Sequence, residues 1–429
     1  MGKGAHMTQK RKILFSVSAV AVASLALAGC SGGSGGVDAD GNVTIELAQW
    51  WEPELPDGEL RALIDQFEDA NPGIKVDLLS GPYASTREQL VAGAASGTMP
   101  DVVGLDGAWV NDFAKQGAIA DLSALIDENG YDDSQLASQV QVNGATYMVP
   151  AVNFVYPLYT NDALLAEAGV DAPPSDRSEF ADAARAITES TDAAGTAMPL
   201  SLETPSGVQN QVMSWLWASG GSMLKDGEPD LTNQGVVDTI TYFDDLYQEG
   251  VFAPGAFTMK EQDMVEEFTN GRVGMMVDSL AHLNLIRESN PDLEFSISAL
   301  PAEDGYDGKR GIPYASWGLG ISSSTEHPEE AWKLFEFLMS EDANSQLSSM
   351  AKAFPGNVDS VPDFVEDDDL MAKAFEIYQD GYPANEFTGL PVAEELMRQM
   401  NTQFQSLLQG DISVDEMLKN TQESWSAEF

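Results

Sequence analysis

The stretch from Val43 to Leu79 reads VTIELAQWWEPELPDGELRALIDQFEDANPGIKVDLL and predicts the class of fold. Residues 43–47 alternate between apolar and polar side chains, which is typical of a half-buried strand. The next apolar residues recur at helical spacing, at Leu60, Leu63, Ile64, Phe67 and Ala70. Asn71-Pro72-Gly73 then ends the helix, and residues 74–79 form a second strand. A strand, a helix and another strand in this order indicate a parallel α/β sheet.

The rest of the chain continues this alternation. Pro100-Asp101-Val102-Val103-Gly104-Leu105 predicts a buried strand. Other strands are expected at 145–149, 154–159, 274–277, 295–300 and 318–322. Helices are expected at 87–95, 110–116, 162–168, 177–189, 209–218, 235–248, 328–338, 370–379, 392–409 and 414–421. The length of 429 residues and a hydrophobic share of 43% predict an α/β protein of two to three domains or two large lobes.

The first 36 residues carry targeting signals. Met1–His6 has the composition of a cloning scar before Met7, and Lys10-Arg11-Lys12 precedes an apolar run at 13–28. This is the pattern of a secretory signal peptide. Leu27-Ala28-Gly29-Cys30 resembles the bacterial lipobox, which implies cleavage before Cys30 and lipidation of that residue. Residues 30–42 are rich in Gly, Ser and Asp and predict a flexible tether.

The charge balance excludes one class of partner. The chain has 69 acidic and 21 basic residues and a net charge of −48. Nucleic acid binding needs a basic surface, so we expect none. Cys30 is the only cysteine, so no intrachain disulfide is possible. Outside the scar, His282 and His327 are the only histidines, and we therefore expect no cofactor and no nitrogen- or sulfur-ligated metal site.

Aromatic and polar side chains follow several predicted strands. Trp50 and Trp51 follow the first strand, and Asp106 and Trp109 follow the third. The carboxyl ends of strands in an open α/β sheet face the ligand crevice, so these residues are candidates for ligand contact. Further candidates are Trp317, which lies near glycines, Trp215 on a helix, and Asp278 and His282. Each has a structural alternative, namely a core aromatic ring, a helix cap for Asp106, or a buried histidine that is satisfied by hydrogen bonds.

Catalytic motifs are mostly absent. Gly32-Gly33-Ser34-Gly35-Gly36 matches the nucleophile elbow formally, but it lies in the tether without a strand before it. The sequence contains neither a P-loop nor a dinucleotide fingerprint. Because acidic residues are so numerous, counting them does not exclude a pair of catalytic carboxylates of the kind that a glycoside hydrolase uses.

Six segments in order resemble the extracytoplasmic solute-binding proteins of carbohydrate ABC importers, the family that includes the maltose-binding protein. They are Phe67–Val76, Ala94–Val103, Met148-Val149-Pro150 with Leu158–Asn161, Phe268–Met275, Ala299-Leu300-Pro301 and the loop around Trp317. The resemblance covers nearly all of the chain after residue 42. It implies a type II periplasmic-binding-protein fold of two α/β lobes that close on a ligand.

The resemblance also implies where the lobes and the ligand lie. Three crossings are expected near 150–154, 293–297 and 351–356. They divide the chain into an N-lobe of 43–150 and 297–350 and a C-lobe of 151–296 and 351–429. The family's ligand positions, carried over to this sequence, hold Trp50, Trp51, Asp106, Trp109, Asn153, Tyr156, Trp215, Asp278, Trp317 and Tyr382. The loop around Tyr83 is expected to line the cleft as well.

The function that the resemblance implies is capture of a sugar or oligosaccharide without chemistry. The expected partners are the transmembrane subunits of an ABC permease and the membrane, reached through the lipid on Cys30. The protein would then be a monomer on the extracytoplasmic face of the cell membrane. The alternatives are a surface-anchored glycoside hydrolase and an adhesive lipoprotein.

Overall fold

The computed structural model describes residues 41–429. The predicted signal peptide, Cys30 and the tether up to residue 40 lie outside the described residues. The strands are β1 (Val43–Gln49), β2 (Ile74–Ser80), β3 (Val102–Leu105), β4 (Val140–Val142), β5 (Ala145–Val155), β6 (Leu158–Asn161), β7 (Ala194–Thr196), β8 (Leu224–Lys225), β9 (Glu228–Pro229), β10 (Val273–Val277), β11 (Phe295–Ser298), β12 (Gly311–Ile321), β13 (Phe354–Pro355) and β14 (Tyr382–Ala384).

Most of the helices alternate with these strands along the chain. The α-helices are α1 (Glu59–Ala70), α2 (Tyr83–Ser96), α3 (Val110–Lys115), α4 (Leu122–Asn129), α5 (Asp162–Glu167), α6 (Arg177–Ser190), α7 (Ser214–Ala218), α8 (Gln234–Gln248), α9 (Glu261–Thr269), α10 (Leu283–Ser289), α11 (Pro328–Leu338), α12 (Glu341–Ala351), α13 (Phe364–Asp367), α14 (Asp369–Asp380), α15 (Ala393–Leu408) and α16 (Val414–Trp425). Short helical turns are η1 (Glu52–Glu54), η2 (Asp133–Gln135), η4 (Leu280–His282) and the π-helical turn η3 (Gln209–Met213).

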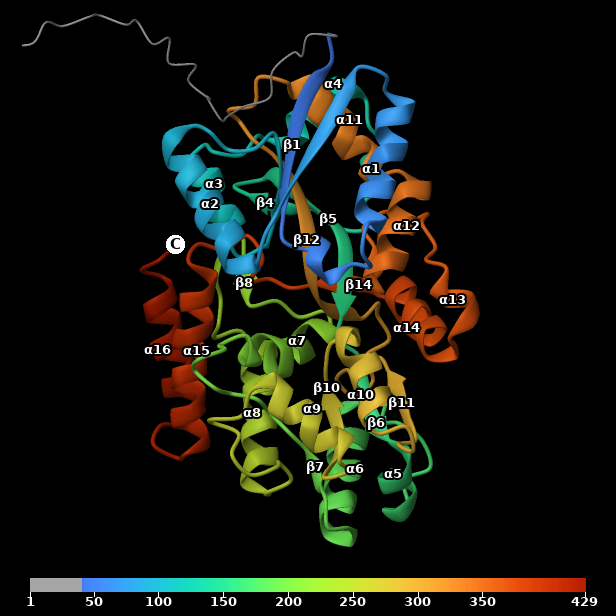
Figure 1. Ribbon diagram of the computed structural model, residues 1–429. Coiled ribbons are helices and arrows are strands. Elements are labelled where there is room, and N and C mark those ends of the chain that lie inside the picture. Colours follow the sequence, from blue (N-terminus) through green and yellow to red (C-terminus); the bar gives the residue numbers. More distant parts are fainter. Residues whose placement is uncertain (1–40) are drawn as a thin grey trace, which may run out of the picture. The chain divides into compact units, whose positions relative to one another are not determined.

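The larger sheet has eight strands, with β13-β5-β12-β3-β1-β2 in order, β14 beside β12 and β4 beside β5. β1 is parallel to β2 and β3, as the first stretch of sequence predicts. β12 is antiparallel to both β3 and β5, so the sheet is mixed rather than parallel. Figure 1 shows α1 and α12 on one side of these strands and α2 and α3 on the other.

The periodicity of the first helix explains how it packs on this sheet. The four residues Leu60, Leu63, Ile64 and Phe67 of α1 are all buried. They belong to the hydrophobic core of the larger sheet together with Ile45 and Leu47 of β1. Gly73 takes a φ of 102° in the turn to β2, a conformation that glycine adopts without strain.

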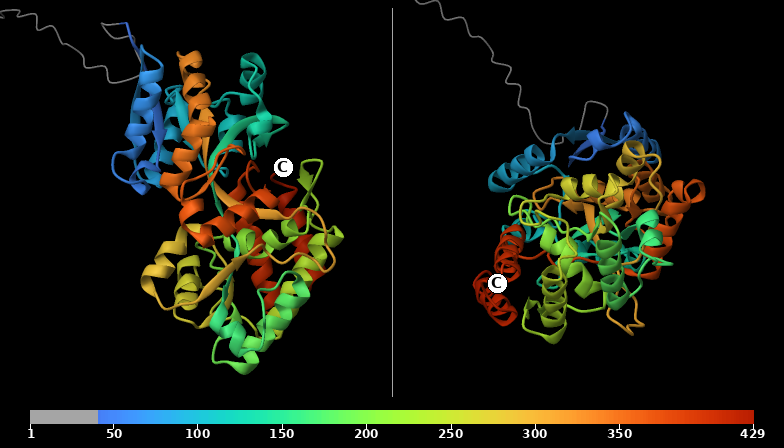
Figure 2. Two further views of the ribbon diagram at one scale, coloured as in Figure 1. Left: turned by 90° about the vertical axis from the view of Figure 1, so that its right-hand side faces the viewer. Right: turned by 90° about the horizontal axis from the view of Figure 1, so that it is seen from below.

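The smaller sheet has four strands in the order β11-β6-β10-β7. β6 is antiparallel to its two neighbours, and β10 is parallel to β7. A second hydrophobic core lies beside it and includes residues of α6, α8, α15 and α16. The two C-terminal helices contact α8, and Figure 2 shows them in red beside the green and yellow-green helices.

The chain passes between the two sheets at three places. The first is between Val155 of β5 and Leu158 of β6. The second lies after Ser298, because all four residues of β11 pair with β6 in the smaller sheet. It therefore falls a few residues later than the expected 293–297. The third follows β13, since α14 contacts β11 of the smaller sheet; β14 then pairs only with the first residues of β12, Gly311–Pro313.

No helix among residues 41–429 is long and apolar enough to cross a membrane.

An ion pair holds α14 to α10 near the third passage. Arg287 of α10 reaches Asp368 through two contacts, Nη1–Oδ2 at 2.5 Å and Nη2–Oδ1 at 3.0 Å. The Asp368 carboxylate also accepts hydrogen bonds from the backbone N–H groups of Leu370 and Met371 and so caps α14. The hydrogen bond from Arg287 lowers the pKa of Asp368 against the opposing effect of burial.

This ion pair predicts a specific pH dependence. Asp368→Asn keeps a good helix cap but loses the pair, so we expect the free energy of unfolding at pH 7 to fall by about 0.5–1 kcal/mol. Because the pKa of Asp368 is lowered by folding, its stabilisation is complete above the unfolded pKa of about 3.9 and is lost as the pH falls below it. Urea unfolding of both proteins between pH 7 and pH 2.5 measures the difference. A gap that stays constant down to pH 2.5 would contradict the assignment.

Candidate functional site

A cavity of about 380 Å³ lies where segments of the two sheets meet. From the larger sheet, Tyr83 at the start of α2 and Asp106 after β3 line it. Tyr156, which follows β5, and Tyr314 and Ser316 of β12 line it as well. The opposite wall includes the loop 203–206, Asn210 of η3, Glu261 at the start of α9, and residues of α15. The cavity is therefore built from strand ends and loops that are far apart in the sequence.

Two loops touch at the rim of this cavity. The backbone N–H of Gly389 donates to the carbonyl of Gly107 at 3.0 Å, and the Asn111 amide donates to the carbonyl of Gly389 at 2.9 Å. A Cβ atom on Gly107 would lie 2.4 Å from Cγ2 of Thr388. Gly107 thus permits a close approach that a side chain would prevent. The loop after β3 is fixed to the loop after β14 by these contacts.

Asp106 and Tyr83 form a polar pair inside the cavity. The Tyr83 hydroxyl donates to Oδ2 of Asp106 at 3.2 Å, and Oδ1 accepts from the backbone N–H of Ala108 at 2.8 Å. Burial raises the pKa of the Asp106 carboxyl, and the hydrogen bond from Ala108 opposes this shift. Asp106 therefore stabilises the turn after β3 and faces the cavity, but it does not cap α3, whose N-cap residue is Trp109.

A chain of aromatic rings leads from Tyr83 into the core. The ring of Tyr83, which is 40% exposed, lies 4.8 Å from that of Trp109 and 5.3 Å from that of Trp50, measured between centroids. Trp50 contacts Trp51, and Trp51 stacks on Trp317 at 5.5 Å. All four tryptophans are at most 6% exposed, and none is among the residues that line the cavity. These four candidates form a wall behind Tyr83.

Three other candidates have contacts elsewhere. Trp215 is 1% exposed and packs against Phe180 and Phe243 in the core of the smaller sheet. The amide of Asn153 donates to the carbonyl of Pro355 and to the hydroxyl of Tyr378, so it joins β5 to β13 and α14. Tyr382 lines a separate surface hollow next to β14. The structure does not bring these residues to the cavity.

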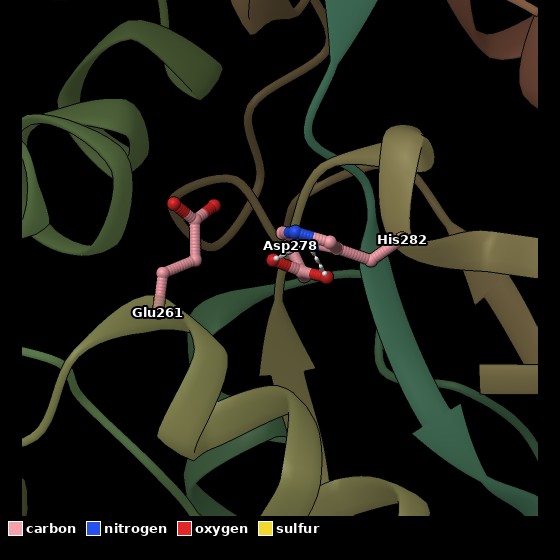
Figure 3. A group of neighbouring side chains, drawn as sticks. All are labelled: Glu261, Asp278 and His282. Carbon is pink, nitrogen blue, oxygen red and sulfur yellow. Dashed lines mark hydrogen bonds and ion pairs between the residues drawn. The ribbon is translucent and has the colours of Figure 1, made fainter. Parts of the chain in front are cut away.

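Glu261, Asp278 and His282 form a cluster at the cavity wall (Figure 3). Their possible ligand atoms all lie within 4.8 Å of one another. Asp278 is fully buried at the end of β10, and Nδ1 of His282 lies 3.0 Å from its Oδ2. The hydrogen bond to Asp278 raises the pKa of His282, and burial raises the pKa of Asp278. Burial, followed by the nearby Asp278 carboxylate, raises the pKa of Glu261 to about 7.

Several residues of the cavity lie outside the sequence-based candidates. They are Glu203, Asn210, Glu261, Tyr314, Asn385, Glu394 and Arg398. Most belong to loops or helix starts, where hydrophobic periodicity does not indicate which way a side chain points. Tyr314 and Ser316 belong to β12, which begins at Gly311 and so extends further toward the N-terminus than the strand expected at 318–322; their nearness to Trp317 in the sequence was the one signal for them.

A family model described as bacterial extracellular solute-binding protein matches residues 52–345. The chain belongs to this family. A putative binding protein of Brucella abortus is 26% identical to this solute-binding protein over 297 residues, which cover 68% of this chain and 71% of that one. The galactooligosaccharide-binding protein of Bacillus subtilis is 23% identical over 340 residues, or 78% of each chain.

A solved structure extends the comparison to the fold. The cyclic alpha-maltosyl-1,6-maltose binding protein from Arthrobacter globiformis matches with a TM-score of 0.77 at 20% sequence identity. The match covers 90% of this solute-binding protein and 99% of that chain. The two-lobed fold expected from the sequence is confirmed by this likeness.

Gly104 allows a sharp test of the aromatic wall of this solute-binding protein. A Cβ atom on Gly104 would lie 2.8 Å from the ring of Trp51, whereas one on Gly81 would meet its nearest neighbour at 3.5 Å. We expect Gly104→Ala to lower the free energy of unfolding by about 1–3 kcal/mol through overpacking. Gly81→Ala is the matched control and should change it little. Urea unfolding followed by tryptophan fluorescence measures both, and equal midpoints for Gly104→Ala and wild type would contradict the packing described.

Proposed function

We propose that the protein captures a sugar, with an oligosaccharide as the expected class, and delivers it to an ABC permease in the membrane. The observation that carries the proposal is the cavity itself, in which aromatic rings and hydrogen-bonding side chains meet between two sheets. Its volume of about 380 Å³ lies at the lower end of the range of about 300–1,000 Å³ for ligand sites. Membership of the solute-binding family and similarity to the galactooligosaccharide-binding protein of Bacillus subtilis support it.

The composition of the cavity favours a neutral ligand rich in hydroxyl groups. The carboxylates of Asp106, Glu203, Glu261 and Glu394 line it, against the single guanidinium of Arg398. Carboxylates accept hydrogen bonds from hydroxyl groups but repel an anion. The rings of Tyr83 and Tyr156 offer apolar faces to the C–H surfaces of a sugar. An acidic sugar or a phosphorylated solute therefore fits less well than a neutral one.

In this proposal, ligand binding is coupled to closure of the two walls of the cavity. The contacts of Gly107 with Thr388 and Gly389 hold the two loops together at the rim. A ligand that touches both walls is bound better by the closed arrangement than by an open one, and its binding shifts the population toward closure. In this proposal the protein acts as a monomer without chemistry, and the lipid on Cys30 keeps it at the extracytoplasmic face beside the permease.

A ligand screen tests the proposed solute class. We expect one group of neutral mono- or oligosaccharides to raise the melting temperature and to give saturable heat in calorimetry, because a ligand that binds only the native state stabilises it. Amino acids, peptides and anionic sugars serve as comparison sets. Binding of one of these sets in place of neutral sugars would overturn the carbohydrate assignment. Chromatography of the bound sugar after prolonged incubation should find it intact, and cleavage products would favour the hydrolase instead.

Variants of Tyr83 test the position of the site. We expect Tyr83→Ala to weaken sugar binding by about 1–3 kcal/mol, as loss of an aromatic contact with the ligand does, whereas Tyr83→Phe keeps the ring and loses less. Tyr306→Ala provides the control. The Tyr306 hydroxyl donates a hydrogen bond to the carbonyl of Lys309, in a loop that does not line the cavity. Calorimetry with the best ligand of the screen measures all three. Equal affinities for Tyr83→Ala and wild type would place the sugar elsewhere.

A further inference from the structure

Glu261, Asp278 and His282 meet at the cavity wall although they come from different segments. Glu261 is the first residue of α9, Asp278 directly follows β10, and His282 lies in η4. Figure 3 shows the imidazole of His282 turned toward the Asp278 carboxylate, with the Glu261 side chain rising from the helix start beside them. The sequence predicts no nitrogen-ligated metal site, because histidines are so few. The structure, however, needs only one histidine for this set.

The two carboxylates of the cluster share a single counter-charge. Asp278 is fully buried and forms an ion pair with His282 at 3.0 Å. The Oε1 atom of Glu261 is also buried and has no hydrogen-bond partner among the described residues. A buried carboxylate oxygen without a partner is destabilising, and two neighbouring carboxylates repel each other. A positive group between them would remove both costs.

We propose that Glu261, Asp278 and His282 bind one divalent transition-metal ion of the zinc class at the wall of the cavity. Two carboxylates and one imidazole are a donor set that zinc accepts, with three protein ligands and one open position. Calcium and magnesium prefer sites built from oxygen atoms alone, so the histidine argues against them. Two carboxylates and a neutral imidazole balance the charge of the ion.

The donor atoms need only a limited rearrangement to form a zinc site. Zinc binds nitrogen and oxygen donors at about 2.0–2.2 Å, so in a tetrahedral site two donors of one ion lie about 3.3–3.6 Å apart. The donor atoms of the cluster already lie within 4.8 Å of one another. Glu261 is partly exposed and lines the cavity, so its carboxylate can move inward by the remaining distance. The fourth position then faces the cavity, where water or a hydroxyl group of a ligand can fill it.

Titration of the full chain with Zn²⁺ after removal of metal by a chelator tests the site. We expect one Zn²⁺ per chain in calorimetry and a rise in melting temperature, because the ion binds the folded arrangement. Glu261→Gln and His282→Asn should each weaken Zn²⁺ binding at least about tenfold, since loss of a ligand costs no less than the loss of a residue that merely supports one. Co²⁺ in place of Zn²⁺ should give the visible absorption of a four-coordinate site in wild type and lose it in both variants.

Matched controls separate this site from other Zn²⁺ binding. Glu266→Gln removes an exposed carboxylate of the same helix, and a double variant of His6 and His327 to asparagine removes the remaining histidines. Both controls should keep the affinity of wild type. Loss of binding in the histidine control, unchanged binding in Glu261→Gln and His282→Asn, or no Zn²⁺ binding by wild type would each overturn the proposal. Thermal unfolding without metal verifies that the variants fold. If His282→Asn does not fold, the Zn²⁺ affinity of Glu261→Gln alone tests the proposed site.

Discussion

The antiparallel pairing of β5 with β12 is the constraint on which the fold and the cavity depend. The pairs Tyr314–Val155, Ala315–Phe154 and Ser316–Asn153 place the strand that leaves the larger sheet beside the strand that enters it. Tyr156, which extends β5, and Tyr314 to Ser316 reach the cavity from this ladder. Asn153 attaches the third passage at the same level through Pro355 and Tyr378. Because side chains alternate along a strand, a slip of one residue would turn every one of these groups to the opposite face.

Sequence patterns predicted the elements better than they predicted the site. The alternation in 43–47 and the spacing of Leu60 to Ala70 correspond to β1 and α1, and the rule that ligands bind at strand ends led to Asp106. The same rule could not tell Trp50 and Trp109, which lie behind the cavity, from Tyr83 in front of them. That distinction depends on tertiary packing, which buries the rings of Trp50 and Trp109 and leaves that of Tyr83 40% exposed. Glu261 begins a helix after an irregular loop, so nothing in its local sequence indicates what its side chain meets.

The acidity of the chain has different consequences on the surface and in the cavity. With a net charge of −48, most carboxylates lie in water, where an isolated charge costs little. Some are offset by a base, as Glu249 is by Arg185 at 2.6 Å. Inside the cavity wall, the charged side chains that act on Asp278 and Glu261 are these two carboxylates themselves and His282, and the cost of burial rises accordingly. Composition alone could not separate these carboxylates from the others, because the difference is one of burial and not of number.

The tryptophans behind the cavity act on it through Tyr83. The Tyr83 ring touches both Trp50 and Trp109, and Trp50 contacts Trp51, which stacks in turn on Trp317. A ring held on one side by buried neighbours loses most of its freedom when the protein folds, so little remains to be lost when a ligand contacts its other side. Gly104 belongs to this arrangement although it lies within β3, because the absent Cβ leaves room for Trp51. The geometry of the cavity wall is therefore fixed by close packing several side chains away from it.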